Sequence, residues 1–327
     1  MRWVRRWLGL AVSVVSLAAV VYWMLQQPAP KLPSTAAGFA WLGLSLVMTL
    51  IALAMRGWRW HRIMVLAHVP HERTDAMSLT AVAYMGNNVL PARGGEILKI
   101  GILGSRTEAR RREILGTVLA ERLLDAVVLA GLFVILSLGL ADSPAGPGTA
   151  ALIGVGLVLG FGAMCLYLYL RRIGRFETFA TTIRPVARAL RLFAHPSGIP
   201  VVGLTVAIWV LEGLNLVVIA ESVGLSLSLL DGVLVITLAS LAAAIPAAPG
   251  FAGTYDWGMI LGLKAAGIAA GAASGMLILS RFMYFVPPTV VGLIVLIGRY
   301  GGLSTARRLR AAELRQNTSR SRPVSTS

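Results

Sequence analysis

The stretch Gly-Asn-Asn-Val-Leu-Pro-Ala-Arg-Gly-Gly-Glu, residues 86–96, interrupts an otherwise apolar segment that runs from about 76 to 100. A second apolar segment, about 227–266, is interrupted by Ile-Pro-Ala-Ala-Pro-Gly-Phe-Ala-Gly at residues 245–253. Because proline and repeated glycine do not continue a helix, each segment is expected to break at these residues. Irregular backbone at membrane depth is tolerated only inside protein or beside a water-filled cavity, so both breaks are predicted to line a cavity.

The overall composition places most of the chain in a lipid bilayer. Hydrophobic residues make up 57% of the 327 positions, charged residues make up 13%, and the mean hydropathy is +0.76. Soluble domains carry about 25% charged residues, so this chain has too few charges for a water-facing surface. The sequence therefore predicts an all-α, polytopic membrane protein in which residues 1–299 form a single membrane domain.

Apolar runs of sufficient length predict the membrane-spanning helices. A helix needs about 20 apolar residues to cross the hydrocarbon core of a bilayer. Six runs are of about this length: 7–25, 38–55, 113–140, 149–170, 199–221 and 270–297. The two broken segments are expected to be re-entrant, which means that each dips into the bilayer and returns to the side from which it entered.

Positive charge lies in short stretches between the apolar runs, and the net charge is +16. The 30 Lys and Arg residues cluster at Arg2–Arg6, Arg56–Arg73, Arg93–Arg112, Arg171–Arg191 and Arg299–Arg322. This distribution is typical of cytoplasmic loops, so a nucleic-acid partner is not expected. It predicts a multi-pass protein of the cytoplasmic (inner) membrane, with both termini and the loop from Arg56 to Arg73 in the cytoplasm. The basic segment 300–327 is expected to be a disordered tail.

The two halves of the chain show the same succession of predicted elements. Residues 7–140 and 149–297 each contain two spanning helices, one re-entrant segment and one further spanning helix. The halves start on opposite sides of the membrane, which makes them inverted repeats. Paired Gly/Pro-broken segments in inverted halves are typical of secondary transporters, whose substrate site lies near the midplane. The alternative is that glycine and proline are simply frequent in membrane helices.

The first break contains side chains suited to an anionic ligand. Asn87 and Asn88 can donate and accept hydrogen bonds, and Gly94 and Gly95 allow the backbone to approach a ligand closely. A helix that begins near Gly95 would point its positive end at an anion. Arg93 adds a planar guanidinium that matches the geometry of a phosphate group.

Five ionisable side chains fall deep inside predicted spans: Glu121, Arg122, Asp125, Glu212 and Arg281. Each charge costs at least about 2.5–3.5 kcal/mol there, so each is expected to face the protein interior and to have a partner. Two interpretations are open. Arg122 and Asp125, and Arg281 and Glu212, form structural ion pairs, or the arginines contact a phosphate of the substrate. We favour phosphate contact for the arginines.

Four motifs resemble the lysylphosphatidylglycerol synthase transmembrane (flippase-like) family. They are Asn87–Glu96, Glu121–Asp125, Pro249–Asp256, and Arg281 with Tyr284 and Pro287, in the family's order over about residues 8–300. The resemblance implies an integral membrane protein that translocates lipids, in some members aminoacylated phosphatidylglycerol. Asp256 departs from the family, which usually has Glu there. Synthase members continue into a soluble aminoacyl-transfer domain, and here polar and basic residues follow Tyr300, so transferase activity is not expected.

Together these observations define a candidate substrate-binding set. It comprises Asn87, Asn88, Pro91, Arg93, Gly94, Gly95, Glu96, Glu121, Arg122, Asp125, Glu212, Pro249, Gly250, Gly253, Asp256 and Arg281. No metal or cofactor is expected, because the four histidines lack ligand spacing and Cys165 is the single cysteine.

The predicted function is a lipid flippase or transporter whose partner is a membrane lipid, either an anionic phospholipid or a lipid-linked substrate. The headgroup is expected to bind between the two breaks. The alternatives are a membrane enzyme that acts on a lipid-linked substrate and a non-transporting subunit of a lipid-modifying enzyme. The sequence leaves the headgroup, the direction of movement, the coupling ion and the oligomeric state open.

Overall fold

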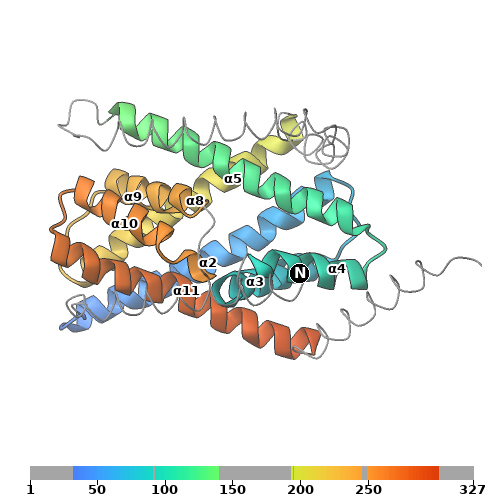
Figure 1. Cartoon of the computed structure of the whole chain (residues 1–327), viewed down its shortest axis with the longest axis horizontal. Helices are drawn as coiled ribbons and strands as arrows, with labels where there is room; N and C mark the ends of the chain where they lie inside the picture. The colour runs from blue at the N-terminus through green and yellow to red at the C-terminus, as the bar shows by residue number, and fades with distance from the viewer. Residues whose placement is uncertain (1–31, 91–92, 140–192, 194, 245–248, 302–327) are drawn as a thin grey trace, which may run out of the picture.

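The computed structural model describes residues 32–90, 93–139, 193, 195–244 and 249–301, and within these ranges the protein is helical without β-strands (Figure 1). The α-helices are α2 (Ala36–Leu66), α3 (Arg73–Val89), α4 (Gly94–Arg106), α5 (Arg111–Gly139), α8 (Ile199–Ser222), α9 (Leu229–Ala242), α10 (Thr254–Ala265) and α11 (Ala270–Tyr300). Two short 3₁₀ turns, η1 (Pro196–Gly198) and η2 (Pro249–Phe251), join them. The prediction of an all-α membrane protein is confirmed.

Three described helices are long and apolar enough to cross a bilayer: α2, η1 with α8, and α11. Helix α5 has 29 residues, which gives it a length of about 44 Å, but it carries Glu121, Arg122 and Asp125. These helices contain the runs predicted from the sequence at 38–55, 199–221 and 270–297, and residues 113–139 of the run predicted at 113–140. The predicted spans 7–25 and 149–170 lie outside the described residues, as does the tail beyond residue 301.

The predicted end of the second span was wrong. Helix α2 continues eleven residues past position 55 to Leu66, so Arg56 and Arg59 belong to the helix and not to a cytoplasmic loop. Both side chains are buried, at 7% and 1% exposure. They tolerate burial because carboxylates of α5 and α8 face them. The loop to α3 therefore begins only after Leu66.

Each broken segment forms a helical hairpin in which two short helices pack side by side. In the first hairpin, α3 and α4 cross closely at Gly95, where an added Cβ would lie 1.9 Å from the Ala83 carbonyl oxygen. In the second hairpin, α9 and α10 cross at Gly258, where an added Cβ would lie 2.7 Å from the Leu238 carbonyl oxygen. Glycine is required at both crossings because any side chain would separate the helices. The first break is shorter than predicted, since α3 continues to Val89 and α4 begins at Gly94.

The hairpins lie toward opposite ends of the described bundle, and their breaks face one another near its centre (Figure 1). Helix α2 packs against α8, α3 packs against α11, and α5 packs against α9. These contacts fall into matching sets, because α2 and α3 in the first half touch as α8 and α9 do in the second. The long helices thus form a frame that holds the two breaks toward each other.

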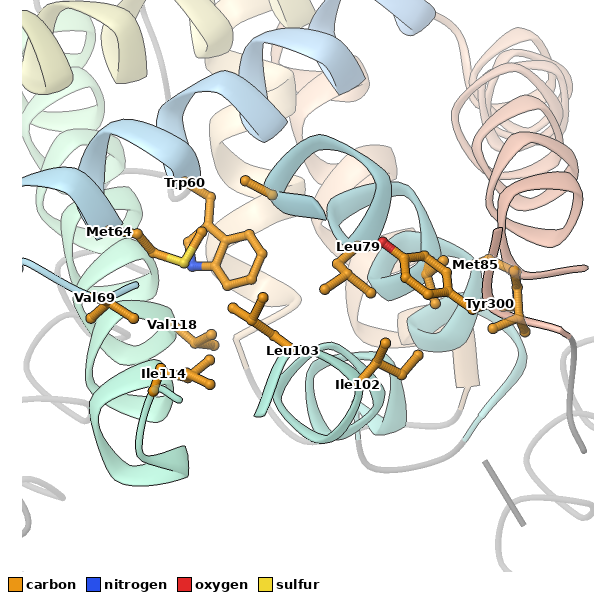
Figure 2. Close-up of a cluster of buried hydrophobic side chains, with 14 residues drawn as sticks. Trp60, Met64, Val69, Leu79, Met85, Ile102, Leu103, Ile114, Val118 and Tyr300 are labelled. Atoms are coloured by element: carbon orange, nitrogen blue, oxygen red, sulfur yellow. The ribbon is translucent and has the colours of Figure 1, made fainter. Parts of the chain in front are cut away.

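A separate apolar core supports each hairpin. Trp60, Leu79, Leu103 and Ile114 bring α2, α3, α4 and α5 together, and Tyr300 closes this cluster at the end of α11 (Figure 2). The second hairpin packs in another cluster, formed by α8, α9, α10 and the first turns of α11. Because each core includes the long helices beside its hairpin, the position of each break is fixed relative to the frame.

Candidate functional site

A cavity of about 240 Å³ lies between the two breaks. Helices α2, α3, α5, α8, α9, α10 and α11, the residue before α4 and the turn η2 all contribute to its lining. Six residues of the predicted set line it: Asn87, Asn88, Arg93, Arg122, Asp125 and Glu212. The prediction that both breaks face one cavity therefore agrees with the structure.

The other predicted residues lie outside the lining or outside the described part of the chain. Glu96 pairs with the lining residue Arg122, and Asp256 and Arg281 pair with each other. Glu121 lies farther back and pairs with Arg59 and Lys99. Gly94, Gly95, Gly250 and Gly253 shape the turns at the breaks. Pro91 is not described, and Pro249 is described only as the first residue of η2.

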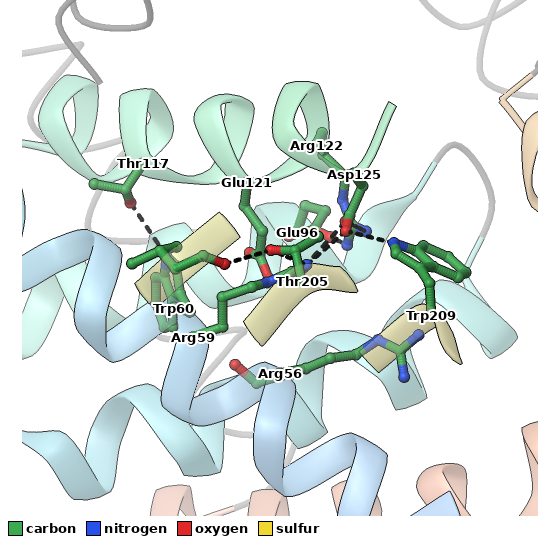
Figure 3. Close-up of polar contacts among 12 residues, drawn as sticks. Arg56, Arg59, Trp60, Glu96, Thr117, Glu121, Arg122, Asp125, Thr205 and Trp209 are labelled. Carbon is green, nitrogen blue, oxygen red and sulfur yellow. Dashed lines mark hydrogen bonds and ion pairs between the residues drawn. The ribbon is translucent and has the colours of Figure 1, made fainter. Parts of the chain in front are cut away.

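Arg59 organises the charges behind the cavity (Figure 3). Its Nη1 donates to Asp125 Oδ1 at 2.6 Å, and its Nη2 donates to Glu121 Oε1 at 2.9 Å. Lys99 donates from Nζ to Glu121 Oε2 at 3.2 Å and lies over the ring of Trp60, 3.7 Å from its centroid. Two cations thus neutralise Glu121, which is only 3% exposed. The sequence interpretation missed both Arg59 and Lys99.

Arg122 joins α5 to the first hairpin. Its Nη2 donates to Glu96 Oε1 at the start of α4, and its Nη1 lies 3.6 Å from Asp125 Oδ2. The predicted pair with Asp125 is present, but the closer partner is Glu96. This contact holds the start of α4 against the long helix that lines the cavity.

Arg281 forms the corresponding contact in the second half. The pairing of Arg281 with Glu212, one of the two alternatives left open by the sequence, is not observed, because Arg281 donates to Asp256 at the start of α10. Its Nη1 also donates to the Gly250 carbonyl at 2.9 Å, and Asp256 accepts a hydrogen bond from the Gly253 N–H at 2.8 Å. Glu212 accepts instead from Arg56, across the contact between α8 and α2. The charge pattern predicts Arg56 in a loop, so the sequence does not indicate it as a partner for Glu212.

The contact between α2 and α8 is internally symmetric: equivalent residues of the two helices are 156 positions apart in the chain. Arg56 and Glu212 have this spacing and pair with each other. Arg59 donates to Thr205 Oγ1 at 3.3 Å, and Asn215, 156 positions after Arg59, donates to Thr49 Oγ1 at 2.9 Å. Since Thr205 also follows Thr49 by 156 positions, the two hydrogen bonds are equivalent.

Arg93 connects the two breaks directly. It precedes α4 in the left-handed conformation, with φ 55°, and its side chain is exposed beside the cavity. Its Nη2 donates to the Ala243 carbonyl at 3.1 Å, and its guanidinium carbon lies 5.3 Å from the centroid of the Phe251 ring. Both partners belong to the second break. Within the described residues, Arg93 has no carboxylate partner.

Asn88 links the first break to the proline-containing part of α11. Its Nδ2 donates to Thr289 Oγ1 at 2.9 Å and to the Phe285 carbonyl at 3.2 Å. These contacts flank Pro287 and Pro288, which lack backbone N–H groups and interrupt the hydrogen-bond ladder of α11. Asn88 thus ties the first break to the turn of α11 that contains the two prolines.

Aromatic side chains form much of the remaining wall. They are Tyr84, Trp209, Phe251, Tyr255, Tyr284 and Phe285. Trp209 donates from Nε1 to Asp125 Oδ1 at 3.2 Å, and the Tyr284 hydroxyl donates to the Glu212 carbonyl at 2.9 Å. The cavity therefore combines apolar surface with a few placed charges, which is typical of small-molecule sites. In the described ranges, no group of three or more His, Cys, Asp or Glu could hold a metal ion.

Comparisons with known proteins match this chain to membrane proteins. The family model of the lysylphosphatidylglycerol synthase TM region matches residues 6–292. A UPF0104 membrane protein of Methanothermobacter thermautotrophicus is 23% identical over 295 residues, which cover 81% of this chain and 87% of that protein. No solved structure shows a significant match.

Proposed function

The chain belongs to the lysylphosphatidylglycerol synthase transmembrane family, and on this basis we propose that it moves a membrane lipid or lipid-linked molecule across the cytoplasmic membrane. The single observation that carries the proposal is the cavity between the two hairpin breaks, which is lined by Arg93, Arg122, Asp125 and Glu212 within an apolar helical frame. Ionisable residues inside a membrane are expensive and mark substrate pathways, so this cavity is the place for a headgroup.

The arrangement of the helices supports a transport cycle between two inverted halves. Helices α2 to α5 form one half and α8 to α11 form the other, with hairpins at opposite ends of the bundle (Figure 1). In this proposal one hairpin enters from the cytoplasm and the other from outside. Transporters with inverted repeats expose a central site to each side in turn by rocking one half against the other. The headgroup occupies the cavity while the acyl chains stay in the bilayer.

We further propose that the protein binds lipid without converting it chemically. Each carboxylate that lines the cavity, Asp125 and Glu212, already accepts from an arginine, so neither is a free general base. The +16 charge serves membrane orientation in this account and not nucleic-acid binding.

Reconstitution tests the proposal directly. Purified full-length protein is placed in vesicles with fluorescent phospholipids, and an impermeant quencher reports how much label has crossed between leaflets. The expected result is movement clearly faster than in protein-free vesicles, with the same rate for Glu108→Gln, which changes an exposed charge away from the cavity. Folded protein that moves no lipid, or that converts lipid to a new product without moving it, would contradict the proposal.

A further inference from the structure

The buried charges around the cavity cancel almost completely. Five cations pair with five carboxylates in the described residues. The cations are Arg56, Arg59, Lys99, Arg122 and Arg281, and the carboxylates are Glu96, Glu121, Asp125, Glu212 and Asp256. A buried set of this kind is stable when it is electrically neutral, because an uncompensated charge in a low-dielectric interior is strongly unfavourable.

Among the described residues that line the cavity, Arg93 is the one charge that this set leaves over. Among the described residues its contacts are a neutral carbonyl at Ala243 and the ring face of Phe251. The side chain lies at the surface of the cavity, where a ligand can reach it. With the ten other groups ionised, the site thus carries a single unbalanced positive charge.

The backbone at Arg93 gives an independent sign that the arginine is there for function. Arg93 precedes α4 at φ 55°, and Gly253 precedes α10 at φ 91° in the second hairpin. Both positions have a positive φ, which glycine adopts freely and arginine does not, and Arg93 lies in the left-handed αL region. Residues held in such disfavoured conformations cluster at ligand sites. The first hairpin therefore has Arg93 in a disfavoured backbone conformation where the second hairpin has glycine. The guanidinium of Arg93 lines the cavity.

We infer that the headgroup taken up by this cavity is a monoanionic phosphodiester, with Arg93 as its counter-charge. The inference rests on the proposed function and specifies its substrate class. Arginine binds two oxygens of a phosphate at once, and such charge-assisted pairs are stronger than the bond that Arg93 makes to a neutral carbonyl. One phosphodiester charge cancels the one charge left over.

Other headgroup charges leave the site unbalanced. A phosphomonoester carries about −1.5 to −2 at neutral pH and brings excess negative charge. A zwitterionic headgroup leaves the site with the charge of Arg93. A headgroup that is net positive, such as a lysylated one, leaves two positive charges together. The order of preference is therefore set by net charge, with the monoanion first.

Two measurements on the full-length protein test this inference. The first is binding in detergent of short-chain lipids that share their acyl chains and carry phosphoglycerol, phosphocholine, phosphomonoester or lysyl-phosphoglycerol headgroups. The second is transport of the matching fluorescent lipids in vesicles. Wild type is expected to bind and move the phosphoglycerol lipid on the order of tenfold better than the others. Arg93→Gln is expected to remove this preference, and Arg93→Lys is expected to keep part of it.

Controls separate loss of charge from loss of fold. Arg93→Gly suits the left-handed backbone, so it is expected to fold and still lose the preference. Arg73→Gln removes an exposed arginine stacked on Trp58 outside the cavity, and it is expected to behave as wild type.

Each outcome decides a different claim. Equal or better handling of zwitterionic or cationic lipid by wild type, or an unchanged preference in both Arg93→Gln and Arg93→Gly, overturns the inference. Selective binding without transport of any lipid overturns the proposed function and leaves the inference standing. A folded protein that neither binds nor moves any of the four lipids overturns both.

Discussion

Each of the two hairpins has an equivalent ion pair at its break, and the hairpins differ in almost every other polar contact. Glu96 and Asp256 are each the third residue of the helix after a break, and each pairs with an arginine of the long helix that follows, Arg122 and Arg281. These pairs hold the helix starts in place at both ends of the cavity. Their recurrence indicates that a hairpin break of this kind depends on such a pair.

Among the described residues, the charges of the larger network all belong to the first half. Arg59, Lys99, Glu121 and Asp125 form a connected network there. The equivalent positions of the second half hold, in the same order, uncharged residues: Asn215, Met259, Ser280 and Tyr284. The second hairpin packs well without the network, since its core is apolar. The network therefore is not needed to build a hairpin, and it concentrates the charge on one side of the cavity.

The largest expected effect comes from removing the centre of that network. Arg59→Gln leaves Glu121 and Asp125 with one cation fewer, and this should lower the free energy of unfolding by about 3–5 kcal/mol. The level of folded protein in the membrane and its thermal midpoint report the loss. Adding Asp125→Asn should restore part of it.

The matched control is Asn215→Ala at the corresponding position of α8. It removes a neutral hydrogen bond to Thr49 and should lower the stability by about 1 kcal/mol. Equal losses of stability in Arg59→Gln and Asn215→Ala would contradict the proposed difference between a charged first half and a neutral second half.

The sequence indicated the equivalent arginines at the two breaks but not the charged network of the first half. Pro91 precedes Arg122 by 31 positions and Pro249 precedes Arg281 by 32, and the two arginines do occupy corresponding places. The breaks, the long spans and the start of α4 near Gly95 also followed from proline, glycine and apolar run lengths.

The network itself could not be read in the same way. Basic residues after an apolar run are typical of a cytoplasmic loop, so the charge pattern predicts a loop at Arg56 and Arg59. Their burial depends on carboxylates 156 and 66 positions away, and only the packing of α2 against α8 and α5 reveals those partners. The spacing of arginines three apart beside Trp58 and Trp60 was the one local sign that the helix continues.

A smaller loss is expected at the shared pairs. Arg122→Gln and Arg281→Gln each leave a buried carboxylate with one cation fewer, and each should lower the stability by about 3 kcal/mol. The double changes Arg122→Gln with Glu96→Gln, and Arg281→Gln with Asp256→Asn, should each recover most of it. Thermal unfolding of the purified variants measures both. A normal midpoint for one arginine variant beside a large loss for the other would show that the pairs are not equivalent.

A still smaller effect is expected where α3 meets the end of α11. Asp75 is 2% exposed and accepts from the Tyr300 hydroxyl at 2.9 Å and from Arg299 Nη2 at 3.0 Å. Asp75→Asn should cost about 2 kcal/mol, because it weakens hydrogen bonds to a charged group. The corresponding residue of the second half, Asp231, is less buried and binds Ser228. Asp231→Asn should therefore change the thermal midpoint much less, and a reversed order would contradict the asymmetry.

Filling the cavity between the breaks tests whether a lipid headgroup passes through it. Ser240 lines it on α9, and Ser240→Trp projects an indole into a space of about 240 Å³. Leu230 lies on the same helix with 57% exposure, and Leu230→Trp adds bulk outside the cavity. Lipid movement in vesicles should fall on the order of tenfold or more for Ser240→Trp and stay at the wild-type rate for Leu230→Trp. A folded Ser240→Trp protein that moves lipid at the wild-type rate would contradict the account.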